Sequence, residues 1–142
     1  MNIILLSGGS GKRLWPLSND VRSKQFIKLF KNNDEYESMV QRVYRQITTV
    51  DADAKITIAT SKSQASAIKN QLGEKASICV EPCRRDTFPA IALATAYLHD
   101  VKGVGPDEPV VVCPVDPYVN NDYFEALKQL SDLAEKGGAN LS

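Results

Sequence analysis

The sequence predicts a doubly wound α/β domain, in which a mostly parallel sheet carries helices on both of its faces. Three observations support this fold class. Short β-branched and apolar runs alternate with amphipathic stretches of helical period along all 142 residues. The apolar runs are consecutive, as in strands that are buried on both faces. Residues that begin or end helices stand between the two kinds of segment.

Four strands and four helices are predicted in this alternating order. The strands are expected at residues 2–7, 55–60, 77–80 and 109–113. The helices are expected at residues 38–48, 63–72, 89–101 and 122–136. Gly73 is placed to end the second helix. Thr87 is the expected N-cap of the third helix, and Asp122 with Glu125 resembles a capping box at the fourth.

The order of the strands is narrowed by general rules of sheet topology. Right-handed crossovers leave few arrangements of parallel strands. In the commonest doubly wound order the fourth strand lies beside the first, and the ligand crevice opens between their carboxyl ends. The loops after Ser7 and Cys113 would then face one crevice. We therefore expect functional residues in both loops.

Composition and charge exclude several classes of protein. Lys and Arg number 17, as do Asp and Glu, so neither nucleic acid nor a membrane surface is an expected partner. The first residues carry no basic leader, and their apolar run is too short to span a bilayer. We therefore expect a cytoplasmic protein. Three cysteines and one histidine, His99, argue against a disulfide framework or a zinc site, and Cys79 and Cys113 are expected to be buried.

The loop after the first strand has the composition of a phosphate-binding loop. Its three glycines are Gly8, Gly9 and Gly11. Glycines allow close backbone approach, and successive N–H groups can bind phosphate oxygens. Lys12 and Arg13 follow directly and add positive charge, although Arg13 excludes a Walker loop, which needs Ser or Thr there. Leu14 stands where a Rossmann loop has its third glycine. The alternative interpretation is a glycine turn with a solvated basic rim.

Three motifs follow one another along the whole chain. Residues 6–18 read Leu-Ser-Gly-Gly-Ser-Gly-Lys-Arg-Leu-Trp-Pro-Leu-Ser, followed by Lys-Gln-Phe at 24–26. Residues 81–94 read Glu-Pro-Cys-Arg-Arg-Asp-Thr-Phe-Pro-Ala-Ile-Ala-Leu-Ala, and residues 113–116 read Cys-Pro-Val-Asp. Together these motifs resemble those of the mannose-1-phosphate guanylyltransferases, which belong to the sugar nucleotidyltransferase superfamily. Lys12, Ser23, Asp86 and Pro117 depart from the Thr, Pro, Asn and His that are usual in that family.

The resemblance implies a Rossmann-like nucleotidyltransferase fold. Residues 1–142 would be its N-terminal nucleotide-binding part, with the remainder of the catalytic domain outside this sequence. The implied reaction transfers a guanylyl group from GTP to mannose 1-phosphate, giving GDP-mannose and pyrophosphate, with Mg²⁺ as cofactor. The isolated fragment is expected to be inactive. Another sugar-1-phosphate nucleotidyltransferase with a different base or sugar, and a non-catalytic nucleotide-binding module, are the alternatives. The oligomeric state is open, a homo-oligomer included.

The residues expected in catalysis and metal binding follow from this resemblance and from their chemistry. Arg13 and Lys24 are expected to bind phosphates during catalysis, because cations after a glycine loop match phosphate oxygens. Asp116 follows a buried strand and suits Mg²⁺, a hard cation that prefers oxygen ligands. For the two basic residues the alternative is an ordinary surface position, and for Asp116 it is an Asp-Pro turn.

The residues expected to bind the nucleotide come from two places. Glu81 ends the third strand, and its carboxylate could accept the adjacent N1–H and N2–H₂ donors of guanine. The alternative is a solvated Glu before a proline. The other candidates belong to the first loop: Leu6, Gly8, Gly9, Gly11 and Lys12. The sequence shows no nucleophilic Ser or Cys constellation, and Asp116-Pro117-Tyr118 is not the DxD of glycosyltransferases.

Overall fold

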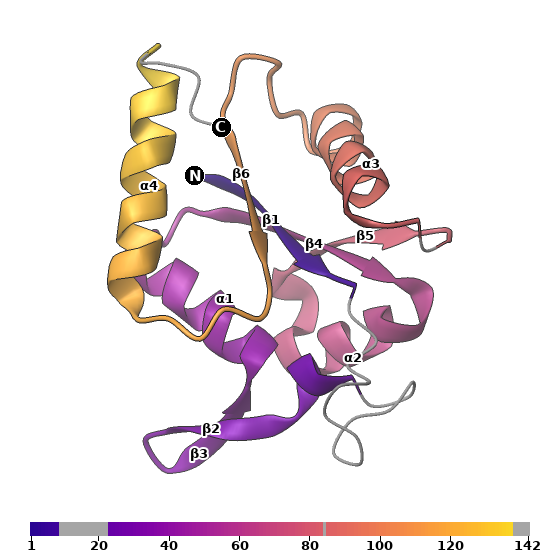
Figure 1. The fold of residues 1–142 in the computed structure, drawn as a ribbon, viewed down its shortest axis with the longest axis vertical. Coiled ribbons are helices and arrows are strands. Elements are labelled where there is room, and N and C mark those ends of the chain that lie inside the picture. Colours follow the sequence, from indigo (N-terminus) through magenta and orange to yellow (C-terminus); the bar gives the residue numbers. More distant parts are fainter. Residues whose placement is uncertain (9–22, 84, 138–142) are drawn as a thin grey trace.

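The computed structural model, which describes residues 1–8, 23–83 and 85–137, is built on a parallel sheet of four strands (Figure 1). The strands are β1 (Asn2–Ser7), β4 (Lys55–Ser61), β5 (Ser77–Glu81) and β6 (Val110–Pro114). Their order is β5-β4-β1-β6, and each neighbouring pair is parallel. The predicted fold class and strand order are therefore confirmed, with bounds that differ by a residue or so.

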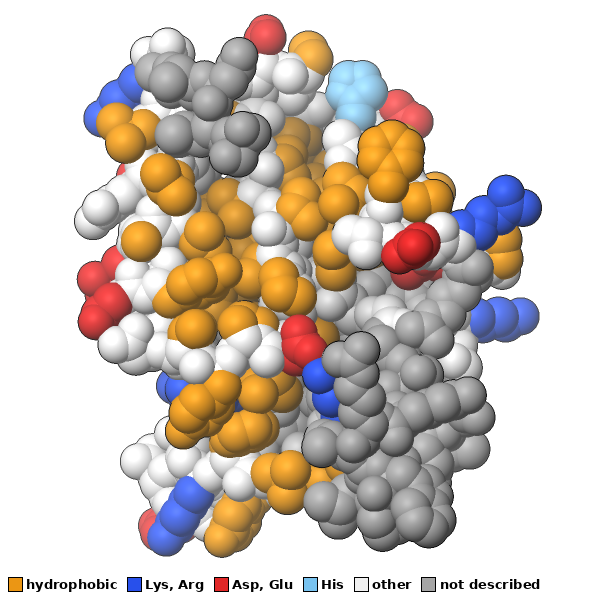
Figure 2. Space-filling model, in the orientation of Figure 1, with side chains coloured by type: hydrophobic (Ala, Val, Ile, Leu, Met, Phe, Trp, Pro, Cys, Tyr) orange, Lys and Arg blue, Asp and Glu red, His pale blue; other side chains and the backbone are white. Residues whose placement is uncertain are grey.

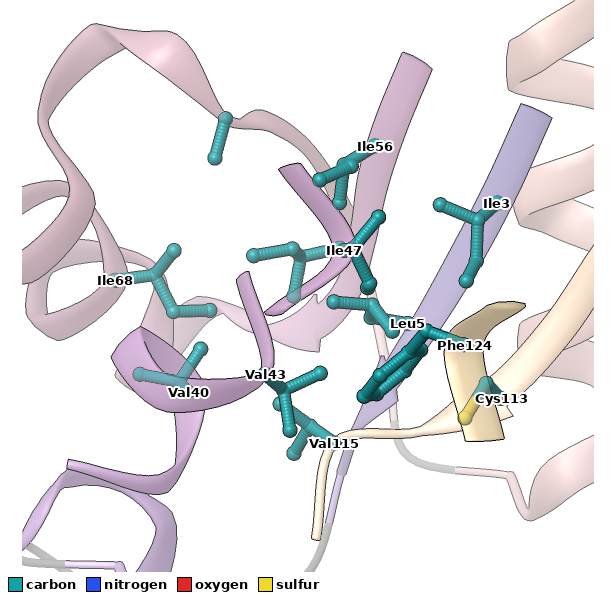
Figure 3. Packing of buried hydrophobic residues seen from close by; sticks show 12 residues of the cluster. Ile3, Leu5, Val40, Val43, Ile47, Ile56, Ile68, Cys113, Val115 and Phe124 are labelled. Atoms are coloured by element: carbon teal, nitrogen blue, oxygen red, sulfur yellow. The ribbon is translucent and has the colours of Figure 1, made fainter. Parts of the chain in front are cut away.

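Helices cover both faces of the sheet, but unequally. Those with residues in the larger core are α1 (Met39–Val50), α2 (Lys62–Leu72) and α4 (Asn121–Glu135), whereas α3 (Thr87–Asp100) covers the other face (Figure 1). The alternation along β1 separates the two layers, because Ile3 and Leu5 join the larger core and Ile4 the smaller one. Figure 3 shows the larger core, where side chains of α1 and α4 converge on β1. No helix in the described ranges is both long and apolar enough to cross a membrane.

A β-hairpin that the sequence pattern does not predict precedes α1. Its strands are β2 (Lys28–Asn32) and β3 (Glu35–Ser38), which pair antiparallel. Asn33 at the turn has a φ of 55°, a conformation that Asn tolerates better than most residues. The Glu37 carboxylate, 2.6 Å from the Arg45 guanidinium, ties the hairpin to α1. The two strands are rich in charged residues and carry no clear apolar alternation, which is why the sequence pattern does not predict them.

Two predictions of helix starts are wrong. Asp86, rather than Thr87, is the N-cap of α3: its Oδ1 accepts a hydrogen bond from the Thr87 N–H at 2.9 Å. Asp86 adopts a φ of 87°, which a prediction from residue preference does not anticipate. Helix α4 begins one residue earlier than expected, with Asn120 as an N-cap that makes no side-chain cap bond. The expected capping box of Asp122 and Glu125 is therefore absent from this helix start, because the start lies too early for that spacing.

The capping box occurs instead at α1, where it can be tested. Ser38 Oγ accepts from the Gln41 N–H at 3.3 Å, and Gln41 Oε1 accepts from the Ser38 N–H at 3.0 Å. Ser61 is a partial control, because it caps α2 without a side-chain cap bond, whereas Ser38 Oγ also donates to Gln71 Oε1 at 2.5 Å. We expect Ser38→Ala to lower the free energy of unfolding by about 1–2 kcal/mol in urea titrations. Ser61→Ala should change it by less than about 0.5 kcal/mol. Equal losses would show that the box contributes nothing specific.

Strand β6 lies at one edge of the described sheet. It pairs with β1 on one side, and no described strand pairs with its outer edge. Val112 of β6 pairs with Ile4, on the face that α3 covers, and is still 39% exposed. Figure 2 shows hydrophobic side chains gathered over this side of the molecule.

Candidate functional site

The carboxyl ends of the parallel strands open into a cavity of about 510 Å³. Such a volume is typical of small-molecule and cofactor sites. The cavity is lined from all four strands and from the start of α3 by Leu6, Ser7, Gly8, Ala59, Glu81, Asp86, Thr87, Ala90, Pro114 and Asp116. The segments that follow Ser7 and Cys113 therefore share one cavity, as the expected strand order requires.

The structure brings together the candidate residues that it describes. Leu6, Gly8, Glu81 and Asp116 line the cavity. Lys24 is absent from the lining but reaches the site through its contact with Asp116. The remaining candidates lie outside the described residues: Gly9, Gly11, Lys12 and Arg13.

Lys24 and Asp116 form an ion pair at the cavity. Lys24, in the short 3₁₀ helix η2 (Lys24–Phe26), donates from Nζ to Asp116 Oδ2 at 2.5 Å. The two side chains are 36% and 43% exposed. A pair this accessible to water contributes only about 0–1 kcal/mol to stability. Its more distinctive property is to place a cation and an anion together beside the cavity.

The loop that carries Asp116 is held from α1. The guanidinium of Arg42 donates to the Val119 carbonyl at 2.7 Å, and Gln46 Nε2 donates to the same oxygen at 3.0 Å. Arg42 also lies over the Tyr118 ring, 4.9 Å from its centroid. These contacts anchor the loop at Tyr118 and Val119, shortly after Asp116, to a helix from an earlier part of the chain.

Glu81 places a carboxylate at the opposite edge of the sheet. It is the last residue of β5, is 8% exposed and lines the cavity. A Cβ added to Gly8 would lie 3.9 Å from Glu81 Oε1, so this carboxylate lies close to the turn after β1. Among the described residues no side chain donates a hydrogen bond to it. This carboxylate faces the cavity, where the donor groups of a ligand could pair with it.

Asp86 lines the cavity, although the sequence motifs do not predict it as a site residue. It lies with Thr87 in the lining, at the start of α3. Its side chain already accepts from the Thr87 N–H, so it holds the helix start in place. The available signal was its departure from the Asn that is usual in the resembling family.

The two buried thiols and the histidine have the surroundings of structural residues. Cys79 and Cys113 are free and buried, as predicted. Burial, and then the negative charge of Glu81, raise the pKa of the Cys79 thiol. Burial is also the main cause that raises the pKa of Cys113. Protonated thiols are poor nucleophiles. His99 Nδ1 lies 3.0 Å from the Val104 carbonyl oxygen, a contact that joins the end of α3 to the loop that follows it.

A metal ion at this cavity would have Asp116 as its protein ligand among the described residues that line it with Glu81 and Asp86. Over the described ranges, no three His, Cys, Asp or Glu side chains cluster as a metal cage would require. Mg²⁺ often binds through one or two carboxylates and completes its shell with water and substrate phosphates. The oxygens of Asp116 beside the cavity fit this shared kind of site, in which a nucleotide contributes ligands.

The comparisons with known proteins agree with this geometry. The chain belongs to the nucleotidyl transferase family, which matches residues 2–141. It is 28% identical over 94% of its length to a mannose-1-phosphate guanylyltransferase of Klebsiella pneumoniae. It is 36% identical over 95% of its length to the xanthan biosynthesis protein XanB of Xanthomonas campestris pv. campestris (strain B100). The chain spans 28% of the length of each of these two relatives.

A solved structure extends the similarity to three dimensions. It is described as a mannose-1-phosphate geranyltransferase from Thermus thermophilus. The superposition has a TM-score of 0.76 at 28% identity, and covers 96% of this chain and 38% of that chain. The described sheet and helices therefore correspond to part of a larger nucleotidyltransferase fold.

Proposed function

We propose that the full-length protein transfers a guanylyl group from GTP to mannose 1-phosphate and releases pyrophosphate. The observation that carries this proposal is the cavity itself, with Glu81 at the end of β5 and, after β6, Asp116 paired with Lys24. The family supports nucleotidyl transfer, and the names of several relatives support the sugar. Both substrates are soluble phosphate esters, which agrees with the expected cytoplasmic location.

The two ends of the cavity would bind different parts of the nucleotide. Glu81 accepts hydrogen bonds from the guanine edge, while Lys24 and Arg13 contact the phosphate oxygens. A phosphate oxygen of the sugar attacks the α-phosphorus in line, a new P–O bond forms, and the α–β anhydride bond breaks to release pyrophosphate. Asp116, together with the phosphates, would hold Mg²⁺, which supplies charge neutralisation when bound. The residues of this chain thus contribute mainly positioning and electrostatic stabilisation.

A turnover screen of the full-length protein tests the proposal. Several nucleoside triphosphates are crossed with several sugar 1-phosphates, and pyrophosphate release is measured. Release with GTP and mannose 1-phosphate above all other pairs supports the assignment. Preference for another pair would move the protein to a different sugar-1-phosphate nucleotidyltransferase. Nucleotide binding without any release would favour a non-catalytic module instead.

Lys24→Ala tests the phosphate end of the cavity. We expect it to weaken GTP binding by about 1.5–3 kcal/mol, the range for hydrogen bonds to charged groups, as measured by calorimetry. Arg13→Ala should have a similar effect. The matched control is Lys128→Ala, because Lys128 is also 36% exposed and pairs with Asp132 away from the cavity. Unchanged GTP affinity in both variants would mean that Lys24 and Arg13 are solvated basic residues that do not contact the phosphates.

A further inference from the structure

A buried amide ties together the two residues that flank Lys24. Ser23 and Gln25 are each 2% exposed, and both bond to Gln64 of α2, which is 8% exposed. Gln25 Nε2 donates to Gln64 Oε1 at 3.1 Å, and Gln64 Nε2 donates to Ser23 Oγ at 2.9 Å. One side chain therefore holds the side chains on both sides of Lys24, and through them restrains this segment.

The same amide connects this segment to the ends of two central strands. Thr60 Oγ1, at the end of β4, lies 3.2 Å from Gln64 Oε1 and 3.0 Å from the Ser7 carbonyl of β1. Its single proton serves one of these acceptors at a time. Gln25 Nε2 also lies 3.5 Å from Ser7 Oγ. Since Ser7 lines the cavity, these hydrogen bonds connect the segment around Lys24 to the cavity wall.

The side chain of Lys24 leaves this anchored segment for the site. Helix η2 is a single short turn, in which the Phe26 N–H bonds the Ser23 carbonyl at 3.1 Å. Lys24 is 36% exposed and reaches Asp116, whereas its neighbours point into the protein. A lysine has a long flexible stem, so its ammonium is placed accurately only if its backbone is fixed. Burying an amide without a hydrogen-bond partner destabilises the folded state. This network pairs the buried amides of Gln25 and Gln64, and in doing so it restrains the segment that carries Lys24.

We propose that Gln64 is a positioning residue for Lys24, and that it affects the reaction through the placement of that ammonium. This inference rests on the proposed nucleotidyl transfer. It assigns a role in the reaction to a residue of α2 that lies outside the cavity lining. The role predicts a dependence that can be measured, because replacing Lys24 removes the ammonium that Gln64 would position.

A double-mutant cycle in the full-length protein tests this dependence. The variants are Gln64→Met, Lys24→Ala and the combination, and kcat/KM for GTP is measured in each. Met keeps the length of the side chain and removes its hydrogen bonds. We expect Gln64→Met to reduce kcat/KM about tenfold in the wild-type background, and less than about twofold in the Lys24→Ala background. Effects that multiply in full would overturn the proposal, because a general structural loss does not depend on Lys24.

Two further variants keep the test decisive. Ile68→Val removes a methylene from a fully buried residue of the same helix and should lower Tm without changing kcat/KM. Should Gln64→Met fail to fold, Ser23→Ala removes one bond of the network, leaves α2 intact and should show the same dependence on Lys24. Wild-type protein without turnover or GTP binding would contradict the proposed function. Normal wild-type turnover with multiplicative effects would overturn the positioning role alone.

Discussion

Asp116→Asn is expected to reduce turnover of the full-length protein by at least about 100-fold, because a bound metal contributes several kcal/mol of charge stabilisation. Asn keeps the shape of the side chain and removes the charge that would hold Mg²⁺ beside the phosphates. The melting temperature should hardly change, since Asp116 is 43% exposed and its pair with Lys24 adds little stability. Steady-state kinetics over a range of Mg²⁺ concentrations and calorimetric Tm values measure the two effects.

The chain offers a closely matched control for this variant. Lys128 and Asp132 form a pair with side-chain exposures of 36% and 45%, against 36% and 43% for Lys24 and Asp116. Asp132→Asn therefore removes the same charge from an equally accessible pair on α4, outside the cavity. It should leave turnover unchanged. Normal Mg²⁺-dependent turnover in Asp116→Asn, or an equal loss in Asp132→Asn, would contradict the assignment of Asp116.

Glu81→Gln is expected to reduce the preference for GTP over ATP. Guanine offers two adjacent donors to a carboxylate, whereas adenine would turn its acceptor N1 toward Glu81. Glu81 is 8% exposed, so that mismatch leaves a buried charge without donors. Gln keeps one acceptor and introduces a donor that faces the guanine donors. The ratio of kcat/KM values for GTP and ATP should fall by about 10–100-fold, mainly through poorer use of GTP.

The control for base recognition is a glutamate of similar burial. Glu37 is 9% exposed and pairs with Arg45 beside the hairpin, away from the cavity. Glu37→Gln should leave the ratio of GTP to ATP unchanged. An unchanged ratio in Glu81→Gln as well would mean that guanine is recognised elsewhere. The backbone groups of the Leu6–Gly8 turn would then be the next candidates.

The strands could be predicted because each is marked by a local run of apolar residues, and their order because general rules of sheet topology restrict it. Consecutive apolar runs predict buried parallel strands, and the handedness of crossovers restricts their order. The shared cavity beyond β1 and β6 follows from that order alone. Lys24 and Asp116 could each be named from a motif and from strand position. Their pairing could not, because 92 positions separate them and their types do not specify a partner.

The features that escaped prediction depend on tertiary packing. Gln64 stands on an amphipathic helix, where a glutamine usually faces solvent. Its burial arises only when the segment around Ser23 and Gln25 packs against α2. The N-cap at Asp86 requires a positive φ that residue type alone does not predict. The first feature depends on a contact between distant segments and the second on a backbone conformation. Neither can be predicted from the spacing of residue types along the sequence.

The central place of β1 has a consequence for how the chain reaches its native state. β1 is synthesised before both of its neighbours, since Asn2 pairs with Lys55 on one side and with Val110 on the other. Ile3, Ile4 and Leu5 become fully buried in the finished sheet, yet one edge of β1 has no strand to pair with until β6 emerges. Strands that are far apart in sequence pair slowly, because the entropy of closing the loop between them is lost before their stabilising contacts form. The nascent protein therefore carries an apolar strand with an open edge until Val110–Pro114 have been synthesised, a state that favours aggregation and makes chaperone protection valuable.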